Sequence, residues 1–329
     1  MKQHKALALF SGGLDSLLAV KWMESRGYTV YPVYFSAPYL KAERALKSAE
    51  ANGISLKVVD FFAEHYPVVK NPVWGRGKGL NPCVDCHALM FQMAAQLLAE
   101  YGASFLISGE VLGQRPMSQT KNALAKVSAM SSVRDLIVRP LSQLLLPDTT
   151  PIKEGWVDRD DLLAINGRSR EAQFALAVKL GINVFPAPAG GCLLTDRNYC
   201  LRLSDLMEHG QDDLESMELL LYGRHFRLNE HNKLIIGRYE SDNNYLQEHC
   251  RQGVTLDAKN CSGPWGVITG LPLSEADLNL ALGIFLYYNS KAQHRDEVVV
   301  NNLYNQDTYT MIADKLDKDT IRKYHISHD

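Results

Sequence analysis

A short apolar run that ends in a glycine turn constrains the fold of this 329-residue chain more than any other feature. Residues 5–10 (KALALF) read as a strand, and Ser11, Gly12 and Gly13 follow as a tight turn. Residues 14–24 then carry apolar side chains at helical spacing. A strand, a glycine turn and a helix in this order are typical of proteins in which strands and helices alternate.

This alternation continues through the first half of the chain, where helices are expected to end at Gly27, Gly53 and Gly102. The expected strands are residues 29–35, 55–61, 104–108 and 137–140, and the expected helices are residues 40–52, 87–101 and 158–180. Right-handed crossovers then require a mostly parallel sheet. We therefore expect a doubly wound α/β domain whose ligand site lies at the carboxyl ends of the strands, where the Ser11 turn lies.

The pattern changes after about residue 220. The expected strands there are residues 224–228, 233–237, 265–269 and 297–301, and the expected helices are residues 242–249 and 274–291. We therefore expect two domains. Residues 1–210 form the doubly wound domain, and residues 211–329 form a smaller α+β domain.

The composition is that of a globular protein, with 46% hydrophobic and 22% charged residues. No apolar run approaches the roughly 18 residues of a membrane span, and the first apolar stretch is too short for a signal peptide. We therefore expect a cytoplasmic protein that does not bind a membrane. Six cysteines are too few for a disulfide framework in a chain of this length, so a cysteine cluster is a candidate metal or catalytic site.

The formal net charge of −2 hides an asymmetry along the chain. Residues 211–329 hold 12 Lys and Arg against 18 Asp and Glu, whereas the first 210 residues hold 23 against 19. A nucleic acid would therefore be attracted mainly by the first domain.

The sequence SGGLDS at residues 11–16 is suited to phosphate binding. Its glycines let the backbone approach an anion, and the free N–H groups and the dipole at a helix start favour negative charge. Ser11 and Ser16 can donate to phosphate oxygens, whereas the Asp15 carboxylate would repel a phosphate unless a divalent cation lies between them. We therefore expect Asp15 to hold Mg²⁺; a glycine turn without a ligand is the alternative.

This segment resembles the SGGxDS loop of the PP-loop ATP pyrophosphatases, which adenylate a carbonyl oxygen and release pyrophosphate. In that family the end of the second strand and a glycine after a later strand frame the nucleotide. The resemblance implies an ATP site that comprises Ser11, Gly12, Gly13, Leu14, Asp15, Ser16, Val33, Tyr34, Phe35 and Gly109.

Three cysteines stand in distinctive surroundings. The sequence NPCVDCH places Cys83 and Cys86 at a helix start, which lowers thiol pKa values, and Cys192 ends the sequence PAGGC. The pair alone is compatible with half of a zinc site that includes His87, with a redox dithiol, or with two buried cysteines. The other three cysteines lack such surroundings and are expected to be buried: Cys200, Cys250 and Cys261.

Together the segments SGGLDS, NPCVDCH, SGEVLGQRPMSQ and APAGGCLLTD resemble the PP-loop tRNA thiouridine synthases that depend on an iron–sulfur cluster, over residues 5–205. In that family three cysteines hold a [4Fe–4S] cluster whose open position binds a sulfur species. The matching residues are Cys83, Cys86 and Cys192. A persulfide on one cysteine, resolved as a disulfide by another, is an alternative, followed by zinc or a structural role.

Four polar residues of the first domain are candidate RNA contacts. Gln114 and Arg115 follow an expected strand and could contact RNA or a triphosphate, and Arg168 and Arg170 begin a helix in the more basic domain. An exposed loop is the alternative for the first pair, and a solvated helix end for the second.

The second domain carries the sequences YGRHFR, GPWG and YYNSKA, which resemble the RNA-associated NFACT-R module. The resemblance implies RNA binding, with Arg224 and Arg227 as candidate contacts because arginine and aromatic side chains can pair with and stack on RNA. A purely structural domain is the alternative.

These observations predict an ATP-dependent tRNA sulfurtransferase with Asp15, Cys83, Cys86 and Cys192 as catalytic residues. It would adenylate a uridine carbonyl and replace its oxygen with sulfur, giving 4-thiouridine or 2-thiouridine, with ATP, Mg²⁺ and a [4Fe–4S] cluster as cofactors. The expected partners are tRNA, a sulfur donor such as sulfide or a cysteine desulfurase, and a second copy of the chain in a homodimer. The alternatives are a sulfur transferase that acts on a small molecule, and a non-catalytic protein that binds nucleotide and RNA.

Overall fold

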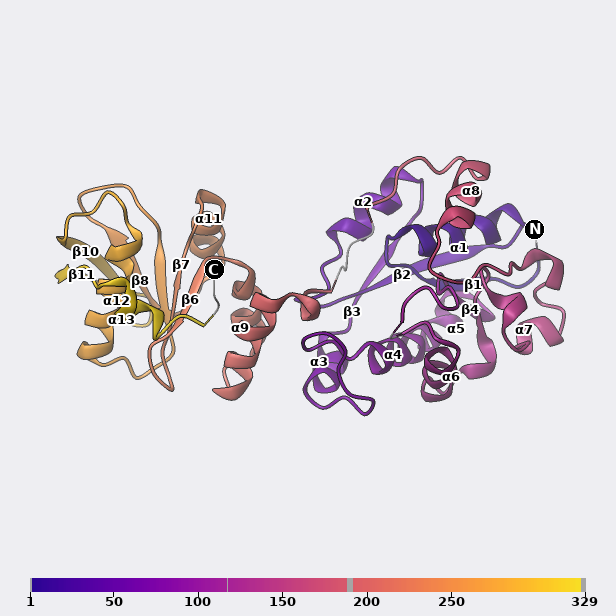
Figure 1. Cartoon of the computed structure of the whole chain (residues 1–329), viewed down its shortest axis with the longest axis horizontal. Coiled ribbons are helices and arrows are strands. Elements are labelled where there is room, and N and C mark those ends of the chain that lie inside the picture. The colour runs from indigo at the N-terminus through magenta and orange to yellow at the C-terminus, as the bar shows by residue number, and fades with distance from the viewer. Residues whose placement is uncertain (1, 117, 188–191, 327–329) are drawn as a thin grey trace. The chain divides into compact units, whose positions relative to one another are not determined.

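The computed structural model describes residues 2–116, 118–187 and 192–326. The chain divides into two compact units, Met1–Thr195 and Asp196–Asp329, and each is built on its own sheet (Figure 1).

The first unit contains a five-stranded sheet in which all neighbouring strands are parallel. Across the sheet the strands are β3 (Lys57–Asp60), β2 (Val30–Ser36), β1 (Ala6–Leu9), β4 (Phe105–Ser108) and β5 (Ile137–Val138). In the central strand, Leu7 lies opposite Tyr31 on one side and Leu106 on the other. Because the sheet grows outward from β1 in both directions, the expected doubly wound fold is confirmed.

Helices cover both faces of this sheet, which explains why β1 is apolar throughout (Figure 1). On one face lie α1 (Leu14–Ser25), α2 (Glu43–Ala51) and α8 (Glu171–Lys179), and on the other α3 (Phe62–Lys70), α4 (Cys83–Gln96) and α6 (Lys121–Met130). The shorter helices are α5 (Leu98–Tyr101), α7 (Thr150–Lys153) and the 3₁₀ turns η1 (Arg134–Leu136), η2 (Gln143–Leu145), η3 (Arg159–Asp161) and η4 (Leu193–Thr195).

The helix expected over residues 158–180 is wrong in its first half, which contains only the turn η3. The side chain of Asp161 accepts hydrogen bonds from Arg26 Nε at 2.6 Å and Tyr28 Oη at 2.9 Å, and its carbonyl accepts one from Trp22 at 2.6 Å. These contacts hold the segment against α1 and the chain that follows it. Only α8 forms as a helix, after Arg170.

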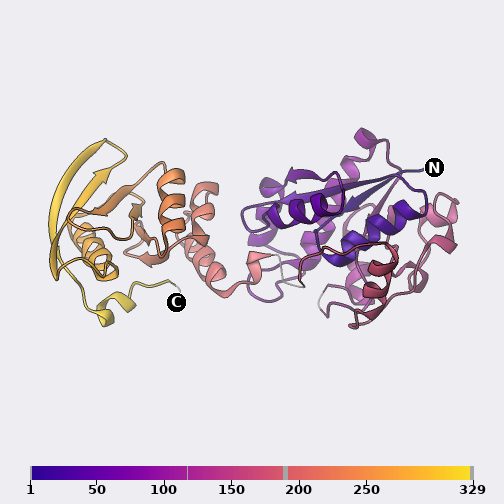
Figure 2. The ribbon, with the colours of Figure 1, turned by 90° about the horizontal axis from the view of Figure 1, so that it is seen from above.

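The second unit contains a six-stranded antiparallel sheet packed against α12 (Glu275–Tyr288). Its strands, in order, are β11 (Asp307–Asp314), β10 (Arg295–Asn302), β8 (Val254–Ala258), β9 (Gly266–Thr269), β7 (Lys233–Ile236) and β6 (Arg224–Arg227). Figure 2 shows the long β10–β11 hairpin in yellow. The remaining helical elements are α9 (Arg197–Glu208), α10 (Leu214–Glu218), η5 (Leu219–Leu221), α11 (Glu240–His249) and α13 (Lys318–Arg322).

The boundary expected after residue 210 lies inside the second unit, which begins at Asp196. The helix α9 accounts for this difference. Its Asp205 forms an ion pair with Arg227 of β6 at 2.6 Å, and its Arg202 donates to the Leu220 carbonyl at 2.7 Å. These contacts make α9 part of the second unit.

Among the described residues, no helix combines the length and the apolar character needed to span a membrane.

Candidate functional site

The SGGLDS loop joins β1 to α1 and is shaped by close backbone contacts. Gly12 has a φ of +76°, and a Cβ at this position would lie 2.6 Å from Cα of Ala45 in α2. Gly109, directly after β4, packs still closer, since its Cβ would lie 2.4 Å from the backbone nitrogen of Ser16. Only glycine fits at either position, so the loop is held between α2 and the end of β4.

The strand residues expected to frame a nucleotide belong mostly to the core. Leu14, Val33 and Phe35 are at most 3% exposed, so only their backbone borders the site. Phe10 donates to the Val33 carbonyl at 2.9 Å, which joins the ends of β1 and β2. Tyr34 is half-buried and donates to the Lys41 carbonyl at 3.0 Å.

The two serines of the loop contact each other and the glycine turn. Ser16 Oγ donates to the Gly13 carbonyl at 2.9 Å, and Ser11 Oγ donates to Ser16 Oγ at 3.2 Å. The Gly13 N–H donates to Ser11 Oγ at 3.4 Å. These bonds pre-form the turn around the backbone N–H groups at the start of α1.

Asp15 lies in the first turn of α1 and is 9% exposed. Its Oδ2 atom accepts hydrogen bonds from Gln114 Nε2 at 2.6 Å and from Arg170 Nη2 at 3.2 Å. Its Oδ1 atom is buried and has no hydrogen-bond partner among the described residues. An unpaired carboxylate oxygen beside a phosphate-binding turn fits the coordination of a divalent cation.

Gln114 was expected to contact RNA or a triphosphate, and Arg170 to contact RNA; the structure places both against Asp15. A further residue, Gln173, was not predicted from the sequence; it is fully buried in α8 and donates to Gln114 Oε1 at 2.7 Å. Its position three residues after Arg170, on the same side of a helix, was the available signal. Arg115 and Arg168, the other two candidate RNA contacts of the first domain, are exposed.

The structure brings Cys83, Cys86 and Cys192 to one region. The first two lie in the first turn of α4. The segment after Cys192 is held by two backbone hydrogen bonds of 3.0 Å, from Leu193 to the Tyr39 carbonyl and from Leu80 to the Leu194 carbonyl. Residues 188–191 of the PAGGC sequence lie outside the described residues.

Burial raises the pKa of the Cys86 thiol well above its usual value, and negative charge on Cys192 and Cys83 raises it further. Burial also raises the pKa of Cys83, although the nearby Arg115 charge and the Asn81 side chain oppose this effect. The expectation of low thiol pKa values at the helix start is therefore wrong, because burial outweighs the helix terminus. The three thiols nevertheless influence one another electrostatically.

The three thiols are chemically suitable for iron, but they are not arranged as metal ligands. Among the described residues, no group of three or more His, Cys, Asp or Glu side chains could hold a metal ion. His87 pairs through Nδ1 with Glu110 Oε1 at 2.9 Å. Arg139 Nε donates to the other Glu110 oxygen at 2.8 Å.

Glu110 and Arg139 of this group were not singled out from the sequence, and both are 5% exposed. Burial alone would raise the pKa of Glu110, but the Arg139 charge and the His87 hydrogen bond lower it to about 2. Glu110 is therefore a fixed negative charge next to the start of α4, the helix that carries Cys83 and Cys86.

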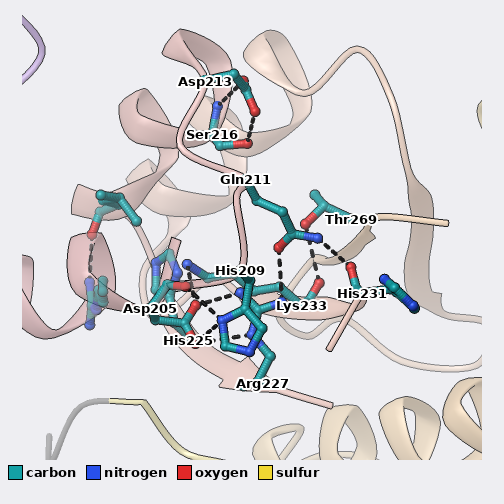
Figure 3. Close-up of polar contacts among 12 residues, drawn as sticks. Asp205, His209, Gln211, Asp213, Ser216, His225, Arg227, His231, Lys233 and Thr269 are labelled. Atoms are coloured by element: carbon teal, nitrogen blue, oxygen red, sulfur yellow. Dashed lines mark hydrogen bonds and ion pairs between the residues drawn. The ribbon is translucent and has the colours of Figure 1, made fainter. Parts of the chain in front are cut away.

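In the second unit, Arg224 lies 4.6 Å from the ring centre of Tyr288. Arg227 is bonded to both carboxylate oxygens of Asp205, at 3.0 and 2.6 Å, so an internal ion pair occupies it (Figure 3). Of the remaining cysteines, Cys200 and Cys250 are buried as expected, whereas Cys261 is partly exposed.

Two family models match separate parts of the chain. Residues 1–145 match the model described as thiamine biosynthesis protein (ThiI), and residues 223–325 match the NFACT protein RNA binding domain. The first match contains the loop, Cys83, Cys86 and Gly109, and the second covers most of the antiparallel sheet.

Curated relatives support the first match. A protein of Thermococcus kodakarensis named "Probable tRNA sulfurtransferase" is 32% identical over 42% of this chain and 37% of its own length. A tRNA sulfurtransferase of Desulfurococcus amylolyticus is 30% identical over 42% of this chain and 29% of its own. The chain thus spans about a third of the length of these relatives.

Among solved structures, a predicted subunit of tRNA methyltransferase from Methanocaldococcus jannaschii aligns with 42% of this chain and 69% of its own, at 18% identity and a TM-score of 0.32. This likeness is too loose to indicate function. The family models confirm both resemblances inferred from the sequence motifs. The chain thus carries an N-terminal segment similar to ThiI and a C-terminal segment similar to the RNA binding domain of NFACT proteins.

Proposed function

We propose that this protein is an ATP-dependent tRNA sulfurtransferase that replaces a uridine carbonyl oxygen with sulfur, giving 4-thiouridine or 2-thiouridine. The observation that carries the proposal is the buried, unpaired Oδ1 atom of Asp15 in a pre-formed PP-loop. Three electrostatically coupled cysteines in the same unit supply a site for sulfur. The similarity to tRNA sulfurtransferases supports the choice of tRNA as substrate.

The first step activates the base. The backbone N–H groups of the loop and the start of α1 bind the ATP phosphates, and Asp15 Oδ1 would hold Mg²⁺, which neutralises charge on the polyphosphate. The uridine carbonyl oxygen attacks the α-phosphorus, a new O–P bond forms, and pyrophosphate leaves. Adenylation is required because an unactivated carbonyl oxygen is a very poor leaving group.

The second step transfers sulfur. With sulfide as donor, hydrosulfide attacks the activated carbon at the site of Cys83, Cys86 and Cys192, the C–O bond breaks, and AMP leaves. With a cysteine desulfurase as donor, the terminal sulfur of a persulfide on one of these cysteines attacks and AMP leaves. A second cysteine thiolate then breaks the S–S bond, which releases the thiocarbonyl and leaves a disulfide that an external thiol reductant reduces. A [4Fe–4S] cluster on these cysteines would keep the sulfur deprotonated, but the described thiols are not arranged as its ligands, and the sulfur transfer does not require it.

The second unit would position the tRNA. Its match to an RNA-binding domain supports this role, whereas its excess of acidic residues argues against a large basic binding surface. Arg224 beside Tyr288 offers an aromatic and cationic pair for a base, whereas Arg227 is held by Asp205.

The proposal is tested with two variants that separate its steps. Asp15→Ala should abolish the release of pyrophosphate from ATP in the presence of tRNA, because the carboxylate oxygen that would hold Mg²⁺ is lost. Cys192→Ser should still release pyrophosphate and should form no thiouridine, measured by mass spectrometry of the digested tRNA. Equal loss of pyrophosphate release in both variants would contradict this division of roles.

Iron and sulfide assays on anaerobically purified protein separate the two forms of sulfur chemistry. Bound iron that is lost in Cys192→Ser would support the cluster. A full sulfur transfer activity in protein free of iron would support persulfide chemistry at the same cysteines.

A further inference from the structure

A chain of buried polar contacts links the PP-loop to α8. Gln173 Nε2 donates to Gln114 Oε1 at 2.7 Å, and Gln114 Nε2 donates to Asp15 Oδ2 at 2.6 Å. Arg170 Nη2 donates to the same Asp15 oxygen at 3.2 Å. Gln114 and Arg170, which are far apart in the sequence, therefore both donate to one carboxylate oxygen, and Gln173 supports the first of them.

The hydrogen-bond chemistry gives this chain a direction. An ionised carboxylate can only accept, so the Gln114 amide must donate its N–H to Asp15 and turn its carbonyl toward Gln173. Gln173 is 0% exposed and Asp15 is 9% exposed, so solvent does not compete strongly for these bonds. The contacts fix Asp15 Oδ2 and leave Oδ1 as the oxygen that remains to be satisfied.

The unsatisfied Oδ1 atom indicates a ligand independently of the hydrogen bonds that Oδ2 accepts. A buried acceptor without a partner is costly, and native proteins rarely retain one without a function. Arg170 alone does not relieve it, because its contact is with Oδ2. A divalent cation that binds together with a nucleotide would satisfy Oδ1.

Arg170 is carried by a segment that is attached to the active edge of the sheet. Gly167 donates to the Leu112 carbonyl at 2.8 Å, which attaches the segment to the loop that contains Gln114. The guanidinium group has five N–H donors, and the Asp15 contact uses one of them. The rest of this planar cation therefore lies next to the phosphate-binding turn, where a polyphosphate would need it.

We propose that Arg170 binds the polyphosphate of ATP together with the PP-loop, and that Gln114 and Gln173 are positioning residues that hold Asp15 with Oδ1 toward the nucleotide-bound metal. This inference rests on the proposed function, because it assigns further residues to the same nucleotide site. Arg170 is thereby assigned to the nucleotide site, whereas its position in the sequence had suggested contact with RNA.

The first test uses two matched arginine variants. Arg170→Gln and Arg168→Gln remove the same charge from the same segment, but Arg168 is exposed and lies two residues from the proposed contact. The affinity of the whole protein for a non-hydrolysable α,β-methylene ATP with Mg²⁺ is measured by titration calorimetry. Arg170→Gln should weaken this affinity by about tenfold or more, the effect of one lost charge-assisted hydrogen bond, and Arg168→Gln should leave it unchanged.

The affinity for tRNA, measured by filter binding without nucleotide, distinguishes the two roles of Arg170. The tRNA affinity should be equal in the two variants, and in each only slightly below that of the unmodified protein because one positive charge is removed. A larger loss of tRNA affinity in Arg170→Gln, with unchanged nucleotide affinity, would overturn the inference and identify an RNA contact.

Gln173→Leu tests the positioning role. The variant cannot donate to Gln114, so the Mg²⁺ concentration that half-saturates analogue binding should rise several-fold. The melting temperature without ligand serves as the check on folding. An unchanged Mg²⁺ requirement in a folded variant would overturn the positioning role.

The outcomes separate this inference from the proposed function. If the unmodified protein binds no nucleotide, the proposed function fails. If it binds nucleotide and Arg170→Gln binds it within twofold of the same affinity, only the inference fails.

Discussion

Gly109 shows how little space the end of β4 leaves for a side chain. A Cβ there would lie 2.4 to 2.5 Å from backbone atoms of Asp15 and Ser16. These atoms cannot move without disturbing the PP-loop. Gly109→Ala should therefore destabilise the protein by about 1 to 3 kcal/mol and weaken binding of the ATP analogue. Thermal unfolding and calorimetric titration measure the two effects.

Gly77→Ala is the control for this substitution. A Cβ at Gly77 would meet only the Asn81 carbonyl, at an ordinary 3.7 Å. Its stability and nucleotide affinity should stay close to those of the unmodified protein. Equal behaviour of the two alanine variants would show that β4 does not hold the loop.

The residues of the PP-loop could be identified from the sequence because a short motif contains them all. The contacts of Arg170 and Gln173 could not be predicted, since the sequence indicates that they lie near a helix start but not which loop that helix packs against. The thiol pKa values were misjudged for a similar reason. The sequence shows the helix terminus, whereas the burial of Cys86 depends on the packing of distant segments.

At the scale of elements, the parallel strands were predicted well because buried parallel strands are short apolar runs bounded by glycine and polar residues. In the antiparallel sheet, β8 and β11 were not predicted. The helix over residues 158–180 was extended too far, since its polar first half is shaped by the contacts of Asp161 and not by local preference. The helix α9 was assigned to the wrong domain for the same reason. Its partners in β6 and β7 follow it by 20 residues or more.

Asp205 is the main electrostatic link between α9 and the antiparallel sheet. It accepts two hydrogen bonds from Arg227 and lies 3.6 Å from the buried Lys233 (Figure 3). Asp205→Asn would leave Arg227 without the carboxylate that compensates its charge and would remove the acceptor beside the buried Lys233, so it should destabilise the second unit by about 3 kcal/mol. Denaturant unfolding measures this, with the exposed Asp319→Asn as a control that should change stability by less than about 0.5 kcal/mol.

For the whole molecule, the unit boundary sharpens the charge asymmetry expected from the sequence. Met1–Thr195 holds 21 Lys and Arg against 16 Asp and Glu, and Asp196–Asp329 holds 14 against 21. The unit that matches an RNA-binding domain is thus acidic overall, and internal pairs such as Arg227 with Asp205 use part of its positive charge. For the proposed binding of tRNA, this distribution favours stacking and shape as the contribution of the second unit, with long-range attraction supplied by the first unit.

The second unit also carries a buried lysine that makes its stability depend on pH. Burial lowers the pKa of Lys233 to about 7; Asp205 opposes the shift, while Arg227 and Arg202 add to it. His225, which faces the same cluster, has a pKa well below its usual value because of burial. The titration of His225 affects stability mainly below pH 6.5. Above about pH 8.5 the buried Cys250, whose pKa burial raises to about 11, also contributes. The contribution of Lys233 is therefore taken from the difference between the unmodified protein and a variant that lacks this lysine.

Between pH 7 and about 10.5 the unfolded chain binds a proton at Lys233 and the folded unit does not. The unfolding free energy should therefore rise with pH in this range, by up to about 1.4 kcal/mol per pH unit. Lys233→Met should remove this rise while keeping a side chain of similar length, and the exposed Lys323→Met should retain it. Calorimetric unfolding at pH 7.5, 8.5 and 9.5 compares the three proteins. Equal slopes in the unmodified protein and Lys233→Met would show that Lys233 is charged in the folded state.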